Sequence, residues 1–410
     1  MPKIKDIKAR EIIDSRAVPT VEVDVFFEDG AIGRASSPSG ASTGSFEAHE
    51  LRDGGSEYSG KGVTKAIDFL EGVIKESLVG KEFEQKDIDN FLCELDGTEN
   101  KKNLGANSIL AVSLAFAKAC SVNQSVPLFR YISSISKREP QMPHGLFNVI
   151  NGGVHADSGI AFQEFMIAPS HPRGWREEVR MAVEIYQTLK SELSDQGYST
   201  SVGDEGGFAP KLSGNREALT FLVRSIEKSG YKPGQDVKIA LDVAGNELID
   251  SEGLYQVDDQ KYSTALLVDY YKDIVKNFPI FSIEDPFSED DEEGFIQLTS
   301  EIGSEINIVG DDLFVTNRSR LKDGIQNKSA NSIIIKPNQV GTLTETLETL
   351  DLAVENNIVP IVSHRSGETE DVFISHLSAG FGTSFIKSGA PARGERTSKY
   401  NELLRIQELL

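Results

Sequence analysis

Charged side chains recur at one end of a series of short apolar segments. Three of these segments end on acids, Asp242, Glu284 and Asp311, and two end on lysines, Lys336 and Lys387. Carboxylates crowded into one cleft repel one another unless they are protonated or share a cation. Oxygen ligands without Cys or His favour a hard ion, Mg²⁺ before Zn²⁺. If the segment ends meet, they predict a divalent-metal site with two ammonium groups beside it.

The apolar segments are typical of strands that are buried on both faces of a parallel sheet. They cover residues 237–242, 280–284, 306–311, 332–336, 358–364 and, more weakly, 383–387. After the first gap the charged ends are about 25 residues apart, close to one strand-plus-helix unit of an eight-unit barrel. Such a β/α barrel gathers the strand ends in one mouth, with His364 and Arg365 at its edge. Each acid alone could be an ordinary strand-end residue, but their repeated position favours a shared site.

Length, charge and cysteine content exclude several classes of protein. The 410 residues suffice for a complete barrel and a smaller second domain. A formal net charge of -22 argues against nucleic acid or an anionic membrane as the main partner. The two cysteines do not suggest a disulfide framework, and no apolar run reaches membrane-spanning length. We therefore expect a soluble, cytoplasmic protein without a nucleic-acid or membrane partner.

The first part of the chain predicts a small α+β domain over residues 1–135. Apolar residues alternate through residues 21–27 and lead into Asp29-Gly30, which is typical of the central strand of a meander. Of the helical segments that follow, residues 107–120 are apolar almost all round and should be buried. The segment 36–45, before them, has no side chain that could anchor a core. It is either a plain surface loop or a lid whose Ser42 could reach a metal.

A second domain is expected over residues 140–410. Residues 146–150 and 161–168 predict two adjacent strands without a helix between them, so the barrel should begin with a β-hairpin. A glycine-rich turn that carries Glu205 should open on the barrel mouth, although an exposed acidic turn is the simpler interpretation. His155, in another glycine turn, carries little weight alone. No Rossmann or P-loop glycine pattern indicates a nucleotide cofactor.

Nine segments, in order along essentially the whole chain, together resemble the enolase family. They are 39–44 (SGASTG), 151–155 (NGGVH), 163–169 (QEFMIAP), 203–210 (GDEGGFAP), 282–287 (SIEDPF), 310–312 (GDD), 336–345 (KPNQVGTLTE), 363–371 (SHRSGETED) and 386–393 (IKSGAPAR). The resemblance implies a small α+β domain followed by a modified TIM-like β/α barrel. It also implies dehydration of 2-phosphoglycerate to phosphoenolpyruvate, two Mg²⁺ ions per active site, and a homodimer or ring of dimers.

The resemblance also assigns roles in proton transfer. The proton to be removed lies next to a carboxylate, so its abstraction builds a doubly charged species that cations must stabilise. The residues that match the family's metal ligands are Asp242, Glu284, Asp311 and, for the second ion, Ser42. Lys336 matches the general base, and Glu205 matches the acid that protonates the departing hydroxyl, with Glu164 beside it. A Lys or His base with one or two Mg²⁺ ions is general to this superfamily.

The remaining matches concern substrate binding. By the resemblance, Lys387 would contact the substrate carboxylate, and Arg365 and Ser366 its phosphate. The residues that would orient the rest of the substrate are His155, Gln163 and His364, and Ser42 would add a contact from the loop. A small phosphorylated acid is therefore the expected ligand.

The chain departs from the family pattern next to several motifs. Pro337 follows Lys336 where the family usually has a β-branched residue, and proline removes a backbone donor. The other departures are Gly245-Asn246 after Asp242, Ala17-Val18 near the N-terminus and Ser384-Phe385 before Lys387. None of them removes a charged site residue.

Two other hypotheses remain open. One is another superfamily lyase or racemase that acts on a different carboxylate, for which the Ser-His-Arg-Ser motif at 363–366 would have no purpose. The other is a binding protein on the same fold that has lost catalysis, which would not explain why every charged site residue is present.

Overall fold

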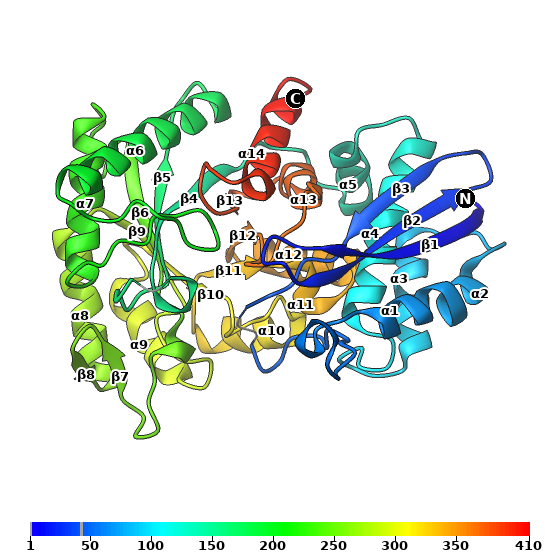
Figure 1. Cartoon of the computed structure of the whole chain (residues 1–410), viewed down its shortest axis with the longest axis horizontal. Helices are drawn as coiled ribbons and strands as arrows, with labels where there is room; N and C mark the ends of the chain where they lie inside the picture. The colour runs from blue at the N-terminus through cyan, green and yellow to red at the C-terminus, as the bar shows by residue number, and fades with distance from the viewer. Residues whose placement is uncertain (1, 42–43, 157) are drawn as a thin grey trace.

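The structure is a computed structural model that describes residues 2–41, 44–156 and 158–410. Its N-terminal part is a sheet packed on helices, drawn in blue and cyan in Figure 1. The sheet consists of β1 (Ile4–Ile13), β2 (Pro19–Phe27) and β3 (Ile32–Ser36), paired antiparallel in that order. The turn at Gly30, with a φ of 95°, joins β2 to β3 and confirms the predicted meander.

The helices of this part cover the sheet. They are η1 (Glu57–Gly60), α1 (Thr64–Phe69), the π-helical η2 (Leu70–Ile74), α2 (Lys75–Leu78), α3 (Gln85–Asp96), α4 (Ala106–Asn123) and α5 (Leu128–Ser136). As predicted, α4 is buried almost all round, because it packs against β2, β3, α3 and α5. Among the described residues no helix by itself has the length and apolarity of a membrane span, although α4 and α5 together, across a bend of 104°, do by length and composition.

The rest of the chain forms a closed barrel with the strand order β10-β11-β12-β13-β4-β5-β6-β9. Its strands are β4 (His144–Asn151), β5 (Glu164–Pro169), β6 (Val237–Asp242), β9 (Ile280–Glu284), β10 (Asn307–Gly310), β11 (Ser332–Ile335), β12 (Val359–Ser363) and β13 (Phe385–Lys387). β5 runs antiparallel to both β4 and β6, whereas the other neighbouring strands are parallel. The predicted opening hairpin and the six predicted apolar strands are therefore confirmed.

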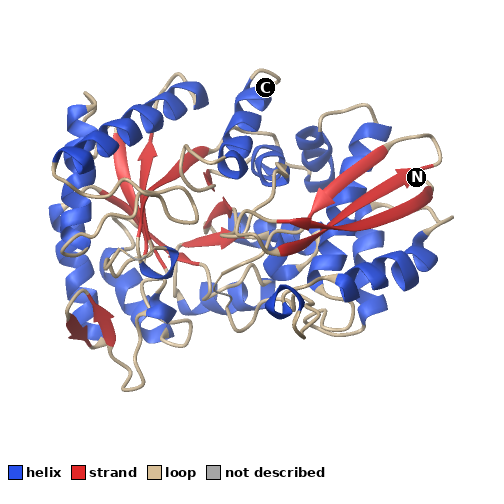
Figure 2. Ribbon diagram, in the orientation of Figure 1, coloured by secondary structure: helices blue, strands red, loops and turns tan. Residues whose placement is uncertain are grey.

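Helices surround the barrel strands, as Figure 2 shows in blue around red. They are η3 (Gly153–His155), α6 (Trp175–Asp195), α7 (Asn215–Lys228), η4 (Gly245–Glu247), α8 (Thr264–Asn277), α9 (Glu292–Ile302), α10 (Arg318–Asn327), α11 (Pro337–Val340), α12 (Leu343–Glu355), α13 (Phe373–Phe381) and α14 (Gly394–Gln407). A separate hairpin is made by β7 (Tyr255–Val257) and β8 (Gln260–Tyr262).

The barrel interior is packed with apolar side chains from six strands, so it is a core and not a pore. These residues form their own buried cluster: Leu146, Met166, Ala240, Val309, Ile334 and Ile361. Strand register then aligns the polar residues at the carboxyl rim, since Glu164 pairs with Asp242 and Asp242 pairs with Glu284. Because β5 is antiparallel, its first residue, Glu164, lies on the same rim as the last residues of β6 and β9.

Candidate active site

The buried rim of the barrel brings the predicted metal-site acids to two lysines. Lys387 Nζ lies 2.9 Å from Asp242 Oδ2, 2.9 Å from both oxygens of Glu284 and 3.3 Å from Glu164 Oε2. Burial lowers the pKa of Lys387, but these acids outweigh it, so that pKa lies well above its usual value. β13 and β9 are four places apart in the barrel order, so Lys387 reaches across the mouth to Glu284.

The second lysine, Lys336, binds the remaining acid, Asp311. Burial lowers the pKa of Lys336, but Asp311 outweighs it and the net shift is upward. Burial also raises the pKa of Asp311, but Lys336 outweighs it, so the net shift of this carboxyl is downward. In this state both lysines carry the charge that balances the rim.

Acidic side chains outnumber the lysines at this rim. The carboxyl groups of Glu164, Asp242, Glu284 and Asp311 lie against two ammonium groups. Burial, and then the charge of Asp242, raise the pKa of Glu284 well above its usual value. A buried cluster of carboxyl oxygens suits a hard divalent cation, so these residues fit Mg²⁺.

The three predicted metal ligands are not yet gathered as tightly as a metal would hold them. In the described part of the chain, two groups have ligand atoms within 4.8 Å of one another: His155, Glu164 and Glu205, and Asp285, Asp311 and Asp312. The second group is less suited to surround an ion, because both carboxylate oxygens of Asp285 already accept hydrogen bonds. The donors are the backbone N–H groups of Asp311 and Asp312, each at 2.8 Å. Asp285, with a φ of 39°, thereby fixes where Asp311 points.

The departure at Pro337 is accommodated by the fold. Pro337 is the first residue of α11, where a helix needs no N–H donor, and the preceding Lys336 N–H donates to Thr316 Oγ1 at 2.9 Å. This short helix carries Gln339, whose Nε2 donates to Asp311 Oδ1 at 2.9 Å. Sequence analysis did not single out Gln339, although it lies in the same motif as Lys336.

The other departure on the rim, Gly245-Asn246, also has a structural reason. A Cβ atom at Gly245 would lie 2.3 Å from the carbonyl carbon of Phe287, so only glycine fits there. Asn246 Nδ2 donates to Asp312 Oδ2 at 2.9 Å, and Asn246 Oδ1 accepts from the Glu289 N–H at 2.8 Å. Burial, and then Asp311, raise the pKa of Asp312 to about 7.

On the opposite side of the mouth, two carboxyl groups lie beside two imidazoles. Glu205 Oε1 is 3.6 Å from His155 Nδ1 and 3.5 Å from His364 Nε2, and Glu205 Oε2 accepts a hydrogen bond from Asn148 Nδ2 at 3.0 Å. Glu164 has an oxygen within 4.8 Å of this group. The predicted turn therefore does open on the barrel mouth. Asn148 was missed because it lies inside β4, where a single polar residue gives no signal.

The two carboxyl groups differ in protonation. Burial, and then the charge of Glu205, raise the pKa of Glu164 well above its usual value. Burial also raises the pKa of Glu205, but His364 and His155 outweigh it and hold that pKa well below its usual value. Burial lowers the pKa of His364 to about 4, so near neutral pH this ring acts on Glu205 through an N–H dipole. The pair thus shares one proton, which Glu164 holds in this state.

Several buried polar atoms here lack a hydrogen-bond partner among the described residues. They are His155 Nδ1, Gln163 Oε1 and His364 Nε2. All three residues line the same cavity as Lys336 and Lys387. Its volume is about 40 Å³, near the share of a single water molecule, so a larger ligand must displace side chains that now fill the mouth. Unpaired buried atoms around such a cavity mark where a polar ligand would bind.

The predicted phosphate ligands lie at one end of this cavity. Arg365 donates to both carboxylate oxygens of Glu47, at 2.9 and 3.1 Å, and to Asn338 Oδ1 at 3.0 Å. Ser366 lines the cavity as well. Glu47 follows the predicted lid and was not singled out from the sequence. Ser42, the predicted ligand on that loop, lies outside the described residues.

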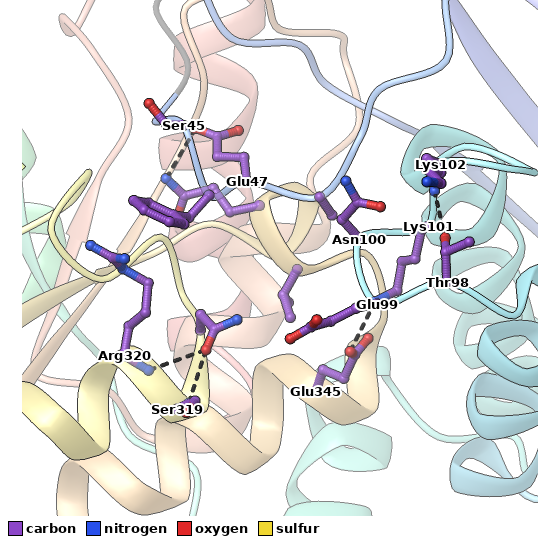
Figure 3. A pocket seen from close by; sticks show the side chains of 15 residues that line it. Ser45, Glu47, Thr98, Glu99, Asn100, Lys101, Lys102, Ser319, Arg320 and Glu345 are labelled. Carbon is purple, nitrogen blue, oxygen red and sulfur yellow. Dashed lines mark hydrogen bonds and ion pairs between the residues drawn. The ribbon is translucent and has the colours of Figure 1, made fainter.

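A larger hollow of about 590 Å³ lies beside the site (Figure 3). It is lined by residues 45–48 and 98–102 and by parts of α10, α11 and α12. Two of its charged groups have partners inside the hollow, since Lys101 Nζ lies 2.9 Å from Glu345 Oε1 and the Arg320 guanidinium lies 3.9 Å from the Phe46 ring centroid. Of the residues predicted for catalysis, metal binding or substrate binding, none that the structure describes lines it.

Comparisons with known proteins cover both parts of the chain. Residues 4–132 match the family model described as "Enolase, N-terminal domain", and residues 139–410 match "Enolase, C-terminal TIM barrel domain". The curated enolase of Corynebacterium kroppenstedtii is 50% identical over 412 aligned residues, which cover 100% of this chain and 96% of that relative. These matches span both parts of the fold described above. The chain therefore belongs to the enolase family.

Proposed function

We propose that this protein catalyses the reversible dehydration of 2-phosphoglycerate to phosphoenolpyruvate. One observation carries the proposal: a lysine beside clustered acids faces a proton-sharing carboxyl pair across one mouth. Lys336 follows β11 and Glu164 begins β5, which is four places away in the eight-strand barrel order. An elimination that takes a proton from one carbon and a hydroxyl from the next needs its base and its acid on opposite sides of the substrate.

Lys336 is the proposed base, and it would take the proton from C2 on Nζ. It needs a neutral amine for this step, whereas its pairing with Asp311 favours the ammonium. When bound by Asp242, Glu284 and Asp311, Mg²⁺ would supply Lewis-acid stabilisation of the charge that builds on the substrate carboxylate. We propose two ions per site, the second held partly by Ser42. Lys387 would then contact the substrate carboxylate in place of the rim acids.

The carboxyl pair is the proposed acid. The carbon–oxygen bond at C3 breaks, and the leaving hydroxide takes a proton and departs as water. Glu164 holds the one proton of the pair, and the two side chains have oxygens within 4.8 Å of each other; Glu164 would pass this proton to Glu205, which would donate it to the leaving hydroxide. The unpaired atoms of His155, Gln163 and His364 would orient the hydroxyl and the substrate chain.

The phosphate would bind at Arg365 and Ser366. A guanidinium that already binds a carboxylate through two hydrogen bonds has the geometry for phosphate. Glu47 occupies that position now, so it would move when the loop 36–45 closes as a lid.

The same proposal covers organisation, assembly and location. We propose residues 1–135 and 140–410 as the two domains, joined where α5 ends at Ser136 and the chain continues to β4. We propose a homodimer or ring of dimers, as the family suggests, in the cytoplasm. The two free cysteines, one partly and one fully buried, support a reducing compartment.

The test is direct measurement of phosphoenolpyruvate formation by the purified protein with 2-phosphoglycerate and Mg²⁺. We expect multiple turnovers, and faster turnover than with a panel of non-phosphorylated hydroxy acids. Faster turnover of a non-phosphorylated acid would favour another superfamily reaction, and no activity with any of them would reject the proposal.

A further inference from the structure

Arg396, in the first turn of α14, is a buried cation next to the active site. Its side chain is 0% exposed, and burying a charge is costly unless it is well paired. The carboxylate of Glu395 lies 3.4 Å from Nε, yet Nε makes no hydrogen bond within the described residues. The guanidinium instead donates to His364 Nδ1 (2.6 Å), to the carbonyls of Arg365 (2.6 Å), Ser366 (2.6 Å) and Asp204 (3.3 Å), and to Ser15 Oγ (3.4 Å).

These partners are parts of the site or its immediate neighbours. Asp204 directly precedes Glu205, and Arg365 and Ser366 are the proposed phosphate ligands. Arg396 is not among the residues that the sequence predicted for the site. Arg396 is buried among site groups, and its hydrogen bonds go to them and not to the carboxylate of Glu395, which suggests a functional reason for its position.

The contact with His364 decides which ring nitrogen carries the proton. A guanidinium can donate hydrogen bonds but cannot accept them, so Nδ1 must be the acceptor. A neutral imidazole with an unprotonated Nδ1 carries its proton on Nε2. Burial, opposed by Glu205 and reinforced by the charge of Arg396, lowers the pKa of His364 to about 4, which agrees with a neutral ring.

The other ring nitrogen faces the proposed acid. His364 Nε2 lies 3.5 Å from Glu205 Oε1 and has no hydrogen-bond acceptor in good geometry among the described residues. Catalytic hydrogen bonds are often long before substrate binds and tighten in the complex. The opposite tautomer would point a proton at a cation and a lone pair at a carboxylate, both of which are repulsive.

We propose that Arg396 is a positioning residue that fixes His364 as the Nε2–H tautomer, so that the ring donates to Glu205. This proposal rests on the proposed function for the role of Glu205 as the acid. The competing explanation is that Arg396 only ties α14 to the loop after β12. That role would stabilise the protein but would set no tautomer.

The first test uses the wild-type protein and needs no variant. Solid-state NMR of the full chain, with isotopically labelled histidine, reports the protonation of each ring nitrogen. The signals that disappear in His364→Asn are those of His364 among the six histidines. We expect an unprotonated Nδ1 and a protonated Nε2 at neutral pH. A proton on Nδ1 of His364 would overturn the proposal. Because the spectrum is independent of turnover, a failure of the proposed reaction would be recognised separately.

The second test compares Arg396→Met, which removes every donor, with Arg396→Lys, which keeps a cationic donor. We expect Arg396→Met to shift the His364 nitrogen signals and to lower kcat roughly 10- to 100-fold, with KM changed much less. Arg396→Lys should recover part of the lost kcat and part of the wild-type position of the His364 nitrogen signals. The matched control is Arg173→Gln, since Arg173 is exposed and pairs with Glu177 on the surface. Unchanged His364 signals in folded Arg396→Met would show that Arg396 acts only structurally.

Discussion

The two sides of the barrel mouth hold their buried charge in different ways. On the metal side, Asp242, Glu284 and Asp311 are paired with lysines from the chain itself. On the acid side, His155 and His364 leave ring nitrogens without hydrogen-bond partners among the described residues, next to Glu205. One side is filled by internal ion pairs, and the other is polar but incompletely paired.

This difference separates what each side must do. A buried carboxylate cluster would be unstable alone, so the lysines keep the metal side folded while no cation is bound. The same pairing keeps Lys336 protonated, which a base cannot be. The acid side instead holds one proton on two carboxyl groups, so it is ready to donate. We therefore expect metal binding to activate one side and to leave the other almost unchanged.

Removal of divalent cations should give the largest effect. Chelation should reduce turnover below detection, because the charge that builds on the substrate would lose its stabilisation and Lys336 would stay paired with Asp311. The fold should survive, since the lysines already balance the rim acids. Saturating Mg²⁺ at about 100 times its Kd should raise the free energy of unfolding by only about 2.7 kcal/mol.

Activity assays and thermal unfolding in chelator, followed by excess Mg²⁺, check this expectation. Activity that returns with Mg²⁺ and circular dichroism that is native throughout would support it. Unfolding in chelator alone would show that the lysine pairs do not hold the metal side together.

Lys336→Ala should come next in size. Loss of a general base typically costs about 10² to 10⁴-fold, and we expect the upper part of this range for kcat because the other lysine on the metal side, Lys387, is held in its ammonium form by the rim acids. Exchange of the substrate C2 proton with deuterated solvent should be lost too. The control is Lys322→Ala, an exposed lysine on α10. Continued exchange in Lys336→Ala would assign the base elsewhere.

Glu205→Gln should have a smaller effect and a different signature. It removes the proposed donor but leaves Lys336 intact, so we expect kcat for dehydration to fall about 10² to 10³-fold while C2 proton exchange continues. Proton exchange followed by NMR, beside a dehydration assay, separates the two steps. If both steps fall together in this variant, the two sides of the mouth do not act independently.

The strand ends could be predicted from the sequence because their signal is local. A run of β-branched residues followed by a polar residue can be recognised without knowing which distant residues contact it. The predicted strand at 306–311, for example, is β10 (Asn307–Gly310) in the structure. The opening hairpin was predictable for the same reason. Once the barrel closes, strand register alone places Asp242 opposite Glu284.

The groups that adjust the site could not be predicted in this way. Glu47 meets Arg365 across 318 residues of sequence, and Arg396 meets His364 across 32. That Lys387 now binds the rim acids also depends on side chains crossing the mouth. Such contacts depend on the closed fold, whereas the motifs give only residue types.

Glu47→Gln should give the smallest effect. It tests whether the Glu47 carboxylate occupies the position where the substrate phosphate would bind Arg365, as the lysines occupy the position of the metal on the other side. The carboxylate of Glu47 now takes both hydrogen bonds that Arg365 would offer to phosphate. Removal of its charge should strengthen the binding of inorganic phosphate, measured by calorimetry, about threefold to tenfold, a change of up to about 1.4 kcal/mol. The loss of an ionic partner for a buried guanidinium should lower the free energy of unfolding by roughly 1 to 3 kcal/mol.

The matched control for this variant is Glu99→Gln, which lies in the neighbouring hollow (Figure 3) and should change neither quantity. Opposite signs for ligand binding and stability are what distinguish a competing internal ligand from a simple structural ion pair. A structural pair would weaken both when broken, because Arg365 would lose its orientation along with its partner. Weaker phosphate binding by Glu47→Gln would therefore mean that Glu47 holds Arg365 in place for the substrate. In that case only on the metal side would charged side chains of the protein occupy the position of a ligand.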